Sequence, residues 1–263
     1  MHSITVAISK GGVGKTLLLA NVGASLASRG SKVVLVDTTE TMHLSRLLGV
    51  NNRNVKVTLE HVVKRSLVLD ESVYPTRFPG LHLIPSGITL KDFLELNPFK
   101  FAEKLSSVDC DFLFIDVPYA TVGRAALLSL GFCQYYILGP LDQTQGMTLC
   151  IEEGLNTIDL AALLKTVPLG FVINKVKEPD KLTNEYLKDL EQLFQMKCLA
   201  VIHYIQKMEE AFEKSPFLPL EKNPESEFTR KTESIADFLQ RGMPRTLKTD
   251  AAEFLHTFIR EKR

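Results

Sequence analysis

Short runs of apolar residues recur along the chain, and stretches with helical periodicity follow most of them. Within these runs apolar and polar residues do not alternate, which is typical of strands buried on both faces of a parallel sheet. Capping residues mark helix starts at Thr58, at Asn97 followed by Pro98, and at Asn223. The pattern predicts strands at 4–8, 32–37, 81–84, 112–116, 135–140, 169–174 and 198–204, and helices at 17–26, 44–48, 59–64, 98–105, 144–164, 179–194 and 224–241.

The alternation of these elements predicts the fold class. It favours an α/β protein: a single-domain, doubly wound and mainly parallel sheet of seven or eight strands, with helices on both faces. We assign residues 1–242 to this domain, because Gly242, Met243 and Pro244 then break the chain. Residues 243–263 are predicted to form a linker and an amphipathic helix with a capping box. The capping box consists of Asp250 and Glu253. The apolar face of the helix consists of Ala251, Phe254, Leu255, Phe258 and Ile259.

A glycine-rich loop joins the first predicted strand to the first predicted helix, and residues 9–16 read Ser-Lys-Gly-Gly-Val-Gly-Lys-Thr. Glycines let backbone N–H groups turn towards phosphate oxygens without interference from a Cβ atom. Lys15 would then reach the β- and γ-phosphates, and the Thr16 hydroxyl would complete a Mg²⁺ shell. The strict pattern has glycine where Ser9 stands, and an ordinary glycine-rich turn is the alternative. The flanking strand and helix favour a nucleotide site, and with it a P-loop NTPase.

Acidic residues end two of the buried runs. Asp37 ends the second predicted strand, and Asp116 ends the fourth. Functional groups in a doubly wound sheet gather at the carboxyl ends of the strands, so Asp37 is expected beside the phosphate loop. Asp116 is interpreted as the carboxylate that holds a Mg²⁺-bound water.

Two lysines, Lys10 and Lys15, bracket the glycines, and this arrangement resembles the deviant Walker A loop of the MinD/ParA ATPases. Residues 47–50, 58–63 and 81–86 are similar to MinD-like proteins, archaeal ones included. The resemblance covers residues 1 to about 242. It implies ATP and ADP as ligands, Mg²⁺ as the metal ion, and an ATP-dependent homodimer. In that dimer Lys10 would reach the phosphates of the partner's ATP.

The resemblance also implies roles for particular residues. In the family, the asparagine at the position of Asn174 hydrogen-bonds the adenine edge; a turn-forming asparagine is the alternative. His203 stands where relatives cover the base with Ile-Pro-Tyr-Asp, and a lone histidine at a strand end is more often structural. The implied nucleotide ligands are Lys10, Gly11, Gly12, Val13, Gly14, Lys15, Thr16, Leu17, Asn174 and Lys175; the implied Mg²⁺ ligands are Thr16, Asp37 and Asp116; the implied catalytic residues are Lys10, Lys15, Asp37 and Glu40.

The chain departs from the family after the second strand. MinD/ParA proteins have Asp-x-Asp there, and the second aspartate helps to place the attacking water. This chain reads Asp37-Thr38-Thr39, and Glu40 stands one residue further on, where its direction differs. We therefore expect hydrolysis to be slow or to depend on an activator protein, and a non-hydrolysing nucleotide-dependent scaffold is an alternative.

Charge and cysteine content narrow the choice of partners. Lys and Arg total 31, as do Asp and Glu, so no global field draws the chain to nucleic acid or to an anionic membrane. The four cysteines form no Cys-x-x-Cys pair, which argues against an Fe–S scaffold ATPase. The sequence shows no signal peptide and no apolar run of about 18 residues. We expect a cytoplasmic protein.

Two cellular roles fit an ATPase that dimerises when it binds ATP. A MinD-like protein positions the cell-division site or another cargo, whereas a ParA-like protein partitions chromosomes or plasmids on DNA. From residue 230 onward there are eight Lys and Arg against five acidic residues, a tilt compatible with weak non-specific DNA binding. The tail at 250–263 either packs on its own domain or lies on the inner face of the membrane, as MinD tails do.

Overall fold

The computed structural model describes residues 1–40, 42–50, 52–65, 67–87, 96–117, 126–206, 210, 217–246, 248 and 250–261, with the side chains of residues 52, 256, 259 and 261 excepted. The strands are β1 (His2–Ala7), β2 (Val33–Asp37), β3 (Tyr74–Pro75), β4 (Leu81–Ile84), β5 (Phe112–Asp116), β6 (Tyr135–Asp142), β7 (Val167–Val176) and β8 (Cys198–His203). The α-helices are α1 (Lys15–Ser28), α2 (His43–Leu48), α3 (Leu59–Arg65), α5 (Pro98–Ser106), α7 (Met147–Leu163), α8 (Asn184–Phe194), α10 (Pro219–Lys222), α11 (Glu227–Arg241) and α12 (Ala251–Glu261). Short turns of other helix types are η1 (Asn52–Asn54), η2 (Leu69–Ser72), η4 (Gln143–Gln145) and η5 (Pro179–Lys181), and η3 (Leu127–Gly131) is a π-helix.

The strands form one sheet in the order β3-β4-β2-β5-β1-β6-β7-β8. All neighbouring pairs are parallel except β3 with β4. Strand β1 therefore lies in the interior of the sheet, and the loop that follows it emerges between the ends of β5 and β6. The predicted doubly wound, mainly parallel fold is confirmed.

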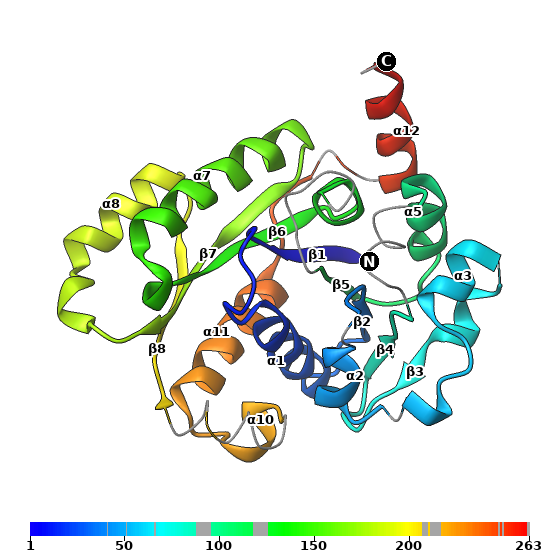
Figure 1. Cartoon of the computed structure of the whole chain (residues 1–263), viewed down its shortest axis with the longest axis horizontal. Coiled ribbons are helices and arrows are strands. Elements are labelled where there is room, and N and C mark those ends of the chain that lie inside the picture. Colours follow the sequence, from blue (N-terminus) through cyan, green and yellow to red (C-terminus); the bar gives the residue numbers. More distant parts are fainter. Residues whose placement is uncertain are drawn as a thin grey trace.

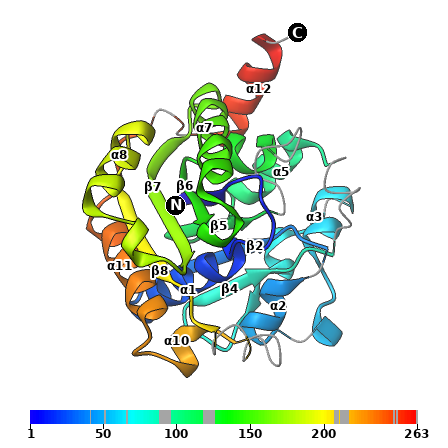
Figure 2. The same ribbon diagram turned by 60° about the vertical axis from the view of Figure 1, so that its left-hand side comes forward.

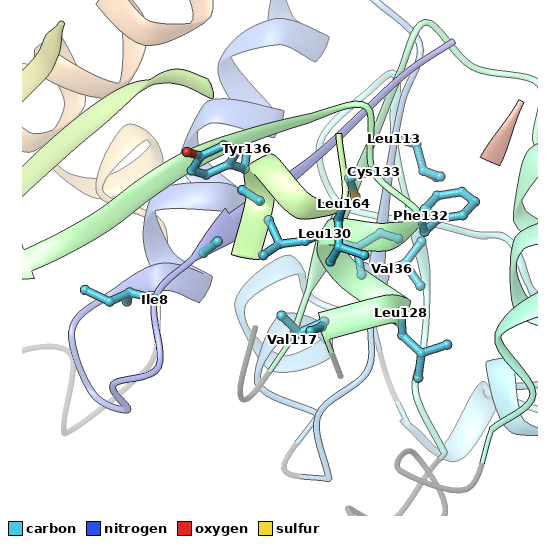
Figure 3. Packing of buried hydrophobic residues seen from close by; sticks show 14 of the residues in the cluster. Ile8, Val36, Leu113, Val117, Leu128, Leu130, Phe132, Cys133, Tyr136 and Leu164 are labelled. Carbon is cyan, nitrogen blue, oxygen red and sulfur yellow. The ribbon is translucent and has the colours of Figure 1, made fainter. Parts of the chain in front are cut away.

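Helices cover both faces of the sheet (Figure 1). One face packs against α1, α2, α10 and α11, and its core is rich in aliphatic residues of α1. The other face packs against α3, α5, α7, α8 and α12. Figure 3 shows part of this second core, in which Leu128 and Leu130 of η3 lie among Val36, Leu113 and Tyr136 from three strands. Because both faces are covered, the strands are apolar throughout, which is why no alternation marks them in the sequence.

The strand that the sequence pattern does not predict is β3. It has two residues, Tyr74 and Pro75, and pairs antiparallel with β4 at the edge of the sheet. So short a strand has no periodicity to detect. Its proline is tolerated because an edge strand needs only one row of hydrogen bonds.

Two helices begin later than the sequence pattern predicts. The helix expected from residue 179 begins at Asn184, because Thr183 caps it by accepting the Tyr186 N–H at 3.1 Å. The preceding Pro179–Lys181 forms the separate turn η5. Similarly, the helix expected from residue 144 begins at Met147, after η4.

The cap predicted at Asn223 is wrong. Helix α11 begins at Glu227, and the Ser226 hydroxyl accepts the Thr229 N–H at 3.2 Å. Asn223 acts through its backbone instead, and its carbonyl accepts the Thr229 hydroxyl at 2.9 Å. By contrast, the cap predicted at Asn97 is confirmed, because its Oδ1 accepts the N–H groups of Phe99 and Lys100.

The C-terminal helix α12 packs against α5 and η3, and its far end projects from the body of the molecule (Figures 1 and 2). Asp250 caps it as predicted, accepting the N–H groups of Ala252 at 2.8 Å and Glu253 at 3.0 Å. Leu255 is fully buried against Gly131, where an added Cβ would meet its Cδ2 at 3.0 Å. The Ile259 side chain and residues 262–263 lie outside the described part of the chain. Of the two interpretations of the tail, these contacts support packing on its own domain.

Lys248 anchors the segment that leads into α12. Its side chain is buried, and its Nζ donates to the carbonyls of Leu130 at 2.7 Å and Cys133 at 2.9 Å and to the Thr166 hydroxyl at 2.8 Å. The same ammonium lies 4.7 Å from the centre of the Phe254 ring on α12, within the range of a cation–π contact. Among the described residues, no helix is both long and apolar enough to cross a membrane.

Candidate functional site

The loop between β1 and α1 has the backbone shape of an anion-binding loop. Gly12 and Gly14 have φ angles of 72° and 100°, in the left-handed region that glycine adopts without strain. Gly14 is also the N-cap of α1, so the free N–H groups and the positive end of the helix dipole face the loop. A Cβ on Gly14 would lie 2.9 Å from Nδ2 of Asn174. A larger residue therefore does not fit at this position.

Side-chain donors hold four successive carbonyls of the loop. Lys15 Nζ donates to Lys10 O, Gln145 Nε2 to Gly11 O at 3.4 Å, Lys175 Nζ to Gly12 O at 3.2 Å, and Asn174 Nδ2 to Val13 O at 2.9 Å. The C=O and N–H of a trans peptide point in opposite directions. The amides of Gly12, Val13 and Gly14 therefore point away from the donors on η4 and β7 and remain for a ligand.

Two carboxylates and a hydroxyl lie beside the loop. Asp37 and Asp116 are paired in register at the ends of β2 and β5, and both are buried. The Thr16 hydroxyl, in the first turn of α1, donates to Asp116 Oδ2 at 2.7 Å. Asp37 Oδ1 accepts from Thr39, whereas Asp37 Oδ2 is buried with no hydrogen-bond partner among the described residues. The predicted metal ligands Thr16, Asp37 and Asp116 are thus brought together.

Burial dominates the electrostatics of this group, and Lys15 offsets only part of its effect on Asp116. Burial raises the pKa of Asp116 to about 7, and repulsion by Asp37 adds to the effect while the hydrogen bond from Thr16 opposes it. Burial likewise raises the pKa of Asp37 to about 6, against the hydrogen bonds from Thr39. Burial lowers the pKa of Lys15, which the carboxylates of Asp116 and Glu153 partly offset.

These residues fit a hard divalent cation. Carboxylate and hydroxyl oxygens are the ligands that Mg²⁺ prefers, and Asp37 Oδ2 is a buried oxygen without a hydrogen-bond partner. A cation would offset the repulsion between the two carboxylates, which raises the pKa of Asp116 despite the charge of Lys15.

The two lysines of the loop differ in their surroundings. Lys15 is buried, and its ammonium is held by the backbone carbonyl of Lys10. Lys10 is half-buried, and its charge lies near enough to Cys150 on α7 to oppose the rise in the thiol's pKa that burial causes. Lys10 thus lies on the α7 side of the loop. Its predicted contact with a partner's nucleotide remains a prediction.

The loop after β2 holds the predicted catalytic acid Glu40. Glu40 is exposed, and its catalytic role stays a prediction. Thr39, in the place of the family's second aspartate, donates to Asp37 from its backbone N–H at 2.8 Å and from its hydroxyl at 2.6 Å. Thr39 therefore supports Asp37 and offers no carboxylate to a water.

The end of β7 meets the phosphate loop through Asn174 and Lys175. Both side chains were expected near the nucleotide, and both donate to loop carbonyls. A contact between Asn174 and a base is still a prediction. His203, at the end of β8, bonds Glu227 through Nδ1 at 2.8 Å and so joins β8 to α11, as a structural histidine does.

Sequence reasoning missed Asp142, at the end of β6, and Gln145, in η4. Asp142 is fully buried and lies 3.5 Å from Lys175 Nζ, and Gln145 reaches the loop at Gly11. A signal was available for Asp142. Asp142-Gln143-Thr144 ends a buried strand with the same Asp-x-Thr pattern as Asp37-Thr38-Thr39.

Comparisons with known proteins agree on one family. Residues 4–217 match the model of the CobQ/CobB/MinD/ParA nucleotide binding domain. An uncharacterised ATP-binding protein of Methanocaldococcus jannaschii is 28% identical over 245 residues, which is 92% of this chain and 89% of that protein. The crystal structure of the cell division ATPase MinD of Pyrococcus furiosus is 25% identical with a TM-score of 0.77, covering 91% of this chain and 98% of that one. The septum site-determining protein MinD of Pyrococcus horikoshii, complexed with Mg-ADP, has the same fold, with a TM-score of 0.76 and 24% identity over 91% of this chain and 96% of that one.

Proposed function

The chain belongs to the CobQ/CobB/MinD/ParA family of nucleotide-binding domains, and from that membership we propose that it is a Mg²⁺-dependent ATPase that dimerises when it binds ATP. The observation that carries the proposal is the phosphate loop itself. Four of its carbonyls are held by side chains, and its Gly12, Val13 and Gly14 amides point away from the donors on η4 and β7. The similarity to an ATP-binding protein over 92% of the chain supports ATP as the nucleotide.

The residues beside the loop divide into binding and metal-holding groups. Lys15 and the loop amides would bind the β- and γ-phosphates, because they supply a buried cation and oriented N–H dipoles. Thr16, Asp37 and Asp116 would hold Mg²⁺, which neutralises charge on the phosphate oxygens when it is bound. Leu17 follows in α1 and is half-buried at the same edge.

Hydrolysis by this chain is proposed to be slow. Thr39 uses its hydroxyl to support Asp37, and Glu40 is exposed one residue further on. The attacking water would therefore be oriented either by the Glu40 carboxylate, after the loop that carries it has moved, or by a group that an activator protein supplies. The same observation favours the second candidate function, a nucleotide-dependent scaffold that binds ATP without hydrolysing it.

The cellular role proposed here is drawn from the relatives. The similarity to a cell division ATPase supports spatial regulation in the cytoplasm, such as positioning the division site or another cargo. The modest basic excess after residue 230 supports DNA partition less strongly. A membrane role for 250–263 is less well supported, because Leu255 is buried on the domain.

The proposed switch is tested by its oligomeric state. Sedimentation velocity with Mg²⁺ and a non-hydrolysable ATP analogue is expected to show a dimer for the wild type and a monomer with ADP. Lys10→Ala is expected to bind the analogue with wild-type affinity but to remain a monomer, because Lys10 is assigned to the partner's phosphates. Lys188→Ala, an exposed lysine on α8, is the matched control and is expected to dimerise. A wild type that stays monomeric, or a Lys10→Ala protein that dimerises normally, contradicts the proposal.

A further inference from the structure

Asp142 carries a buried charge next to the phosphate loop, and the roles assigned so far do not use it. It is the last residue of β6 and is 0% exposed. Its Oδ1 accepts the N–H and the hydroxyl of Thr144 at 2.9 Å and 2.6 Å, whereas Oδ2 has no hydrogen-bond partner among the described residues. Lys175 Nζ lies 3.5 Å from that Oδ2. A buried carboxylate needs a counter-charge, and Lys175 supplies it.

Lys175 connects this carboxylate to the loop. Its Nζ donates to Gly12 O at 3.2 Å while it lies against Asp142 Oδ2. In an extended strand, Asn174 and Lys175 would point to opposite faces of the sheet. Lys175 instead has φ 54°, a left-handed conformation that non-glycine residues rarely adopt. This turn lets two consecutive side chains reach two consecutive carbonyls, those of Val13 and Gly12.

The same local motif occurs at the carboxyl ends of two strands, β2 and β6. Asp37 and Asp142 each close a strand, and each binds the threonine two residues on through Oδ1. Each leaves Oδ2 buried without a hydrogen bond to any residue that the structure describes. The Oδ2 of Asp37 lies at the proposed cation site, whereas the Oδ2 of Asp142 faces an ammonium that belongs to the chain.

We propose that Asp142 is a positioning residue for nucleotide binding, acting through Lys175 on the Gly12 carbonyl. This inference rests on the proposed function and deepens it. Gly12 C=O and Val13 N–H belong to one peptide plane, so a carbonyl held towards Lys175 keeps the Val13 amide turned towards the phosphates. Without the carboxylate, the lysine loses the charge that orients it, and the loop loses a preorganised donor.

The test is isosteric neutralisation, measured as ATP affinity by calorimetry with Mg²⁺. Asp142→Asn is expected to weaken ATP binding about ten-fold, the effect of one charge-assisted hydrogen bond. The turnover number at saturating ATP is expected to stay unchanged, because the interaction is present in the ground state as well. Asp159→Asn, an exposed carboxylate on α7, is the matched control and is expected to bind like the wild type.

A double-mutant cycle separates positioning from mere packing. If Asp142 acts through Lys175, then Asp142→Asn in a Lys175→Met background weakens ATP binding no further. A second loss of about ten-fold in that background, or wild-type affinity of Asp142→Asn, overturns the inference. If Asp142→Asn does not fold, the double variant, which buries no unpaired charge, is compared with the wild type. It too is expected to bind ATP about ten-fold more weakly, and wild-type affinity overturns the inference.

An experiment without nucleotide distinguishes this inference from the proposed function. The ¹⁵N order parameter of the Val13 amide in the nucleotide-free protein is expected to be lower in Asp142→Asn than in the wild type, and unchanged in Asp159→Asn, because the variant no longer holds the Gly12–Val13 peptide in one orientation. A lower order parameter in Asp142→Asn, together with a wild type that binds no ATP, would reject the ATPase and keep the positioning role of Asp142. An unchanged order parameter in Asp142→Asn, together with a wild type that binds ATP, would reject the positioning role alone.

Discussion

Thr39 donates twice to the same oxygen of Asp37, from its backbone N–H at 2.8 Å and from its hydroxyl at 2.6 Å. The second hydrogen bond exists because a threonine replaces the aspartate that the MinD/ParA pattern has at this position. A carboxylate there would repel Asp37, which is already buried beside Asp116. Thr39 therefore stabilises the nucleotide-free site and removes a group that could orient water.

The first prediction is that Thr39→Asp raises ATP turnover. A carboxylate that positions the attacking water contributes on the order of 10²–10⁴-fold in general-base steps, and we expect a gain towards the low end of that range. The same change is expected to lower the melting temperature of the nucleotide-free protein, because it adds a third negative charge beside Asp37 and Asp116. Both quantities are measured on one preparation, by phosphate release and by thermal unfolding.

Thr39→Ser is the matched control for that prediction. It keeps the hydroxyl that donates to Asp37, so its turnover and melting temperature are expected to stay close to those of the wild type. An unchanged rate in Thr39→Asp would mean that Glu40 or an activator already places the water.

A second prediction concerns Lys15, whose buried ammonium is held by the Lys10 carbonyl. Lys15→Ala is expected to abolish measurable ATP binding, because it removes the buried point charge of the loop while leaving the glycines intact. Calorimetry with Mg²⁺-ATP measures this, with the exposed Lys188→Ala as control. Retained affinity in Lys15→Ala would remove the basis for a nucleotide site here.

Much of this architecture can be predicted from local sequence, because each central strand is covered on both faces and is therefore apolar throughout. Residues 33–37 and 112–116 show this clearly. The edge strand β3 cannot be predicted from the sequence, because two residues are too few to show a periodic pattern of apolar and polar side chains. Ser226 and Asn223 are comparable caps by propensity, so propensity alone does not predict that α11 begins after Ser226.

The candidate site is predictable only where a motif spans contiguous residues. The loop at 9–16 and the acids at strand ends are recognisable, since parallel strands bring their carboxyl ends to one edge. The hydrogen bond from Lys175 to the Gly12 carbonyl cannot be recognised in the sequence, because it depends on a backbone turn at residue 175 and on the strand register between β6 and β7. Asp142 shares the Asp-x-Thr pattern with Asp37, but the sequence does not reveal which cation each carboxylate meets.

The third prediction is a pH dependence of stability set by Asp37 and Asp116. Both have a pKa raised above the unfolded value of 3.8, chiefly by burial. The folded protein therefore retains protons between about pH 4 and pH 7 that the unfolded chain has released, so stability falls as pH rises through this window. Thermal unfolding of the nucleotide-free protein is expected to show a loss on the order of 2 kcal/mol between about pH 5.5 and pH 7. Above about pH 7 the loss is opposed by Lys248, because burial lowers its pKa to about 7 and the unfolded chain then holds the extra proton.

Asp116→Asn tests the assignment of that slope, since an amide does not titrate and ends the repulsion with Asp37. The variant is expected to lose most of the decline above about pH 5.5, whereas Asp159→Asn keeps it. Added Mg²⁺ with ADP is expected to flatten the wild-type slope as well, because a cation favours the ionised carboxylates. A wild type whose stability rises over this range would contradict the prediction.

The last prediction concerns whether the C-terminal helix α12 binds a membrane. This helix is amphipathic, but it already packs on α5 and η3. Lys248 Nζ donates to the carbonyls of Leu130 in η3 and Cys133 just after it and to the Thr166 hydroxyl just before β7, and it lies 4.7 Å from the Phe254 ring. Leu255 is fully buried against Gly131. Releasing the chain from Lys248 through α12 to a membrane would expose Leu255 and leave those buried acceptors without their donor, at a cost of several kcal/mol.

We therefore predict that a chain stopped at Gly242 melts about 5–10 °C below the full chain, and that neither form sediments with anionic liposomes in the presence of ATP. Lys248→Met keeps the helix but removes the ammonium, so it is expected to lower the melting temperature by part of that amount. Arg245→Met, an exposed cation in the same linker segment, is the matched control and is expected to melt like the wild type. ATP-dependent co-sedimentation of the full chain, lost on truncation without a change in melting temperature, would show instead that α12 serves the membrane.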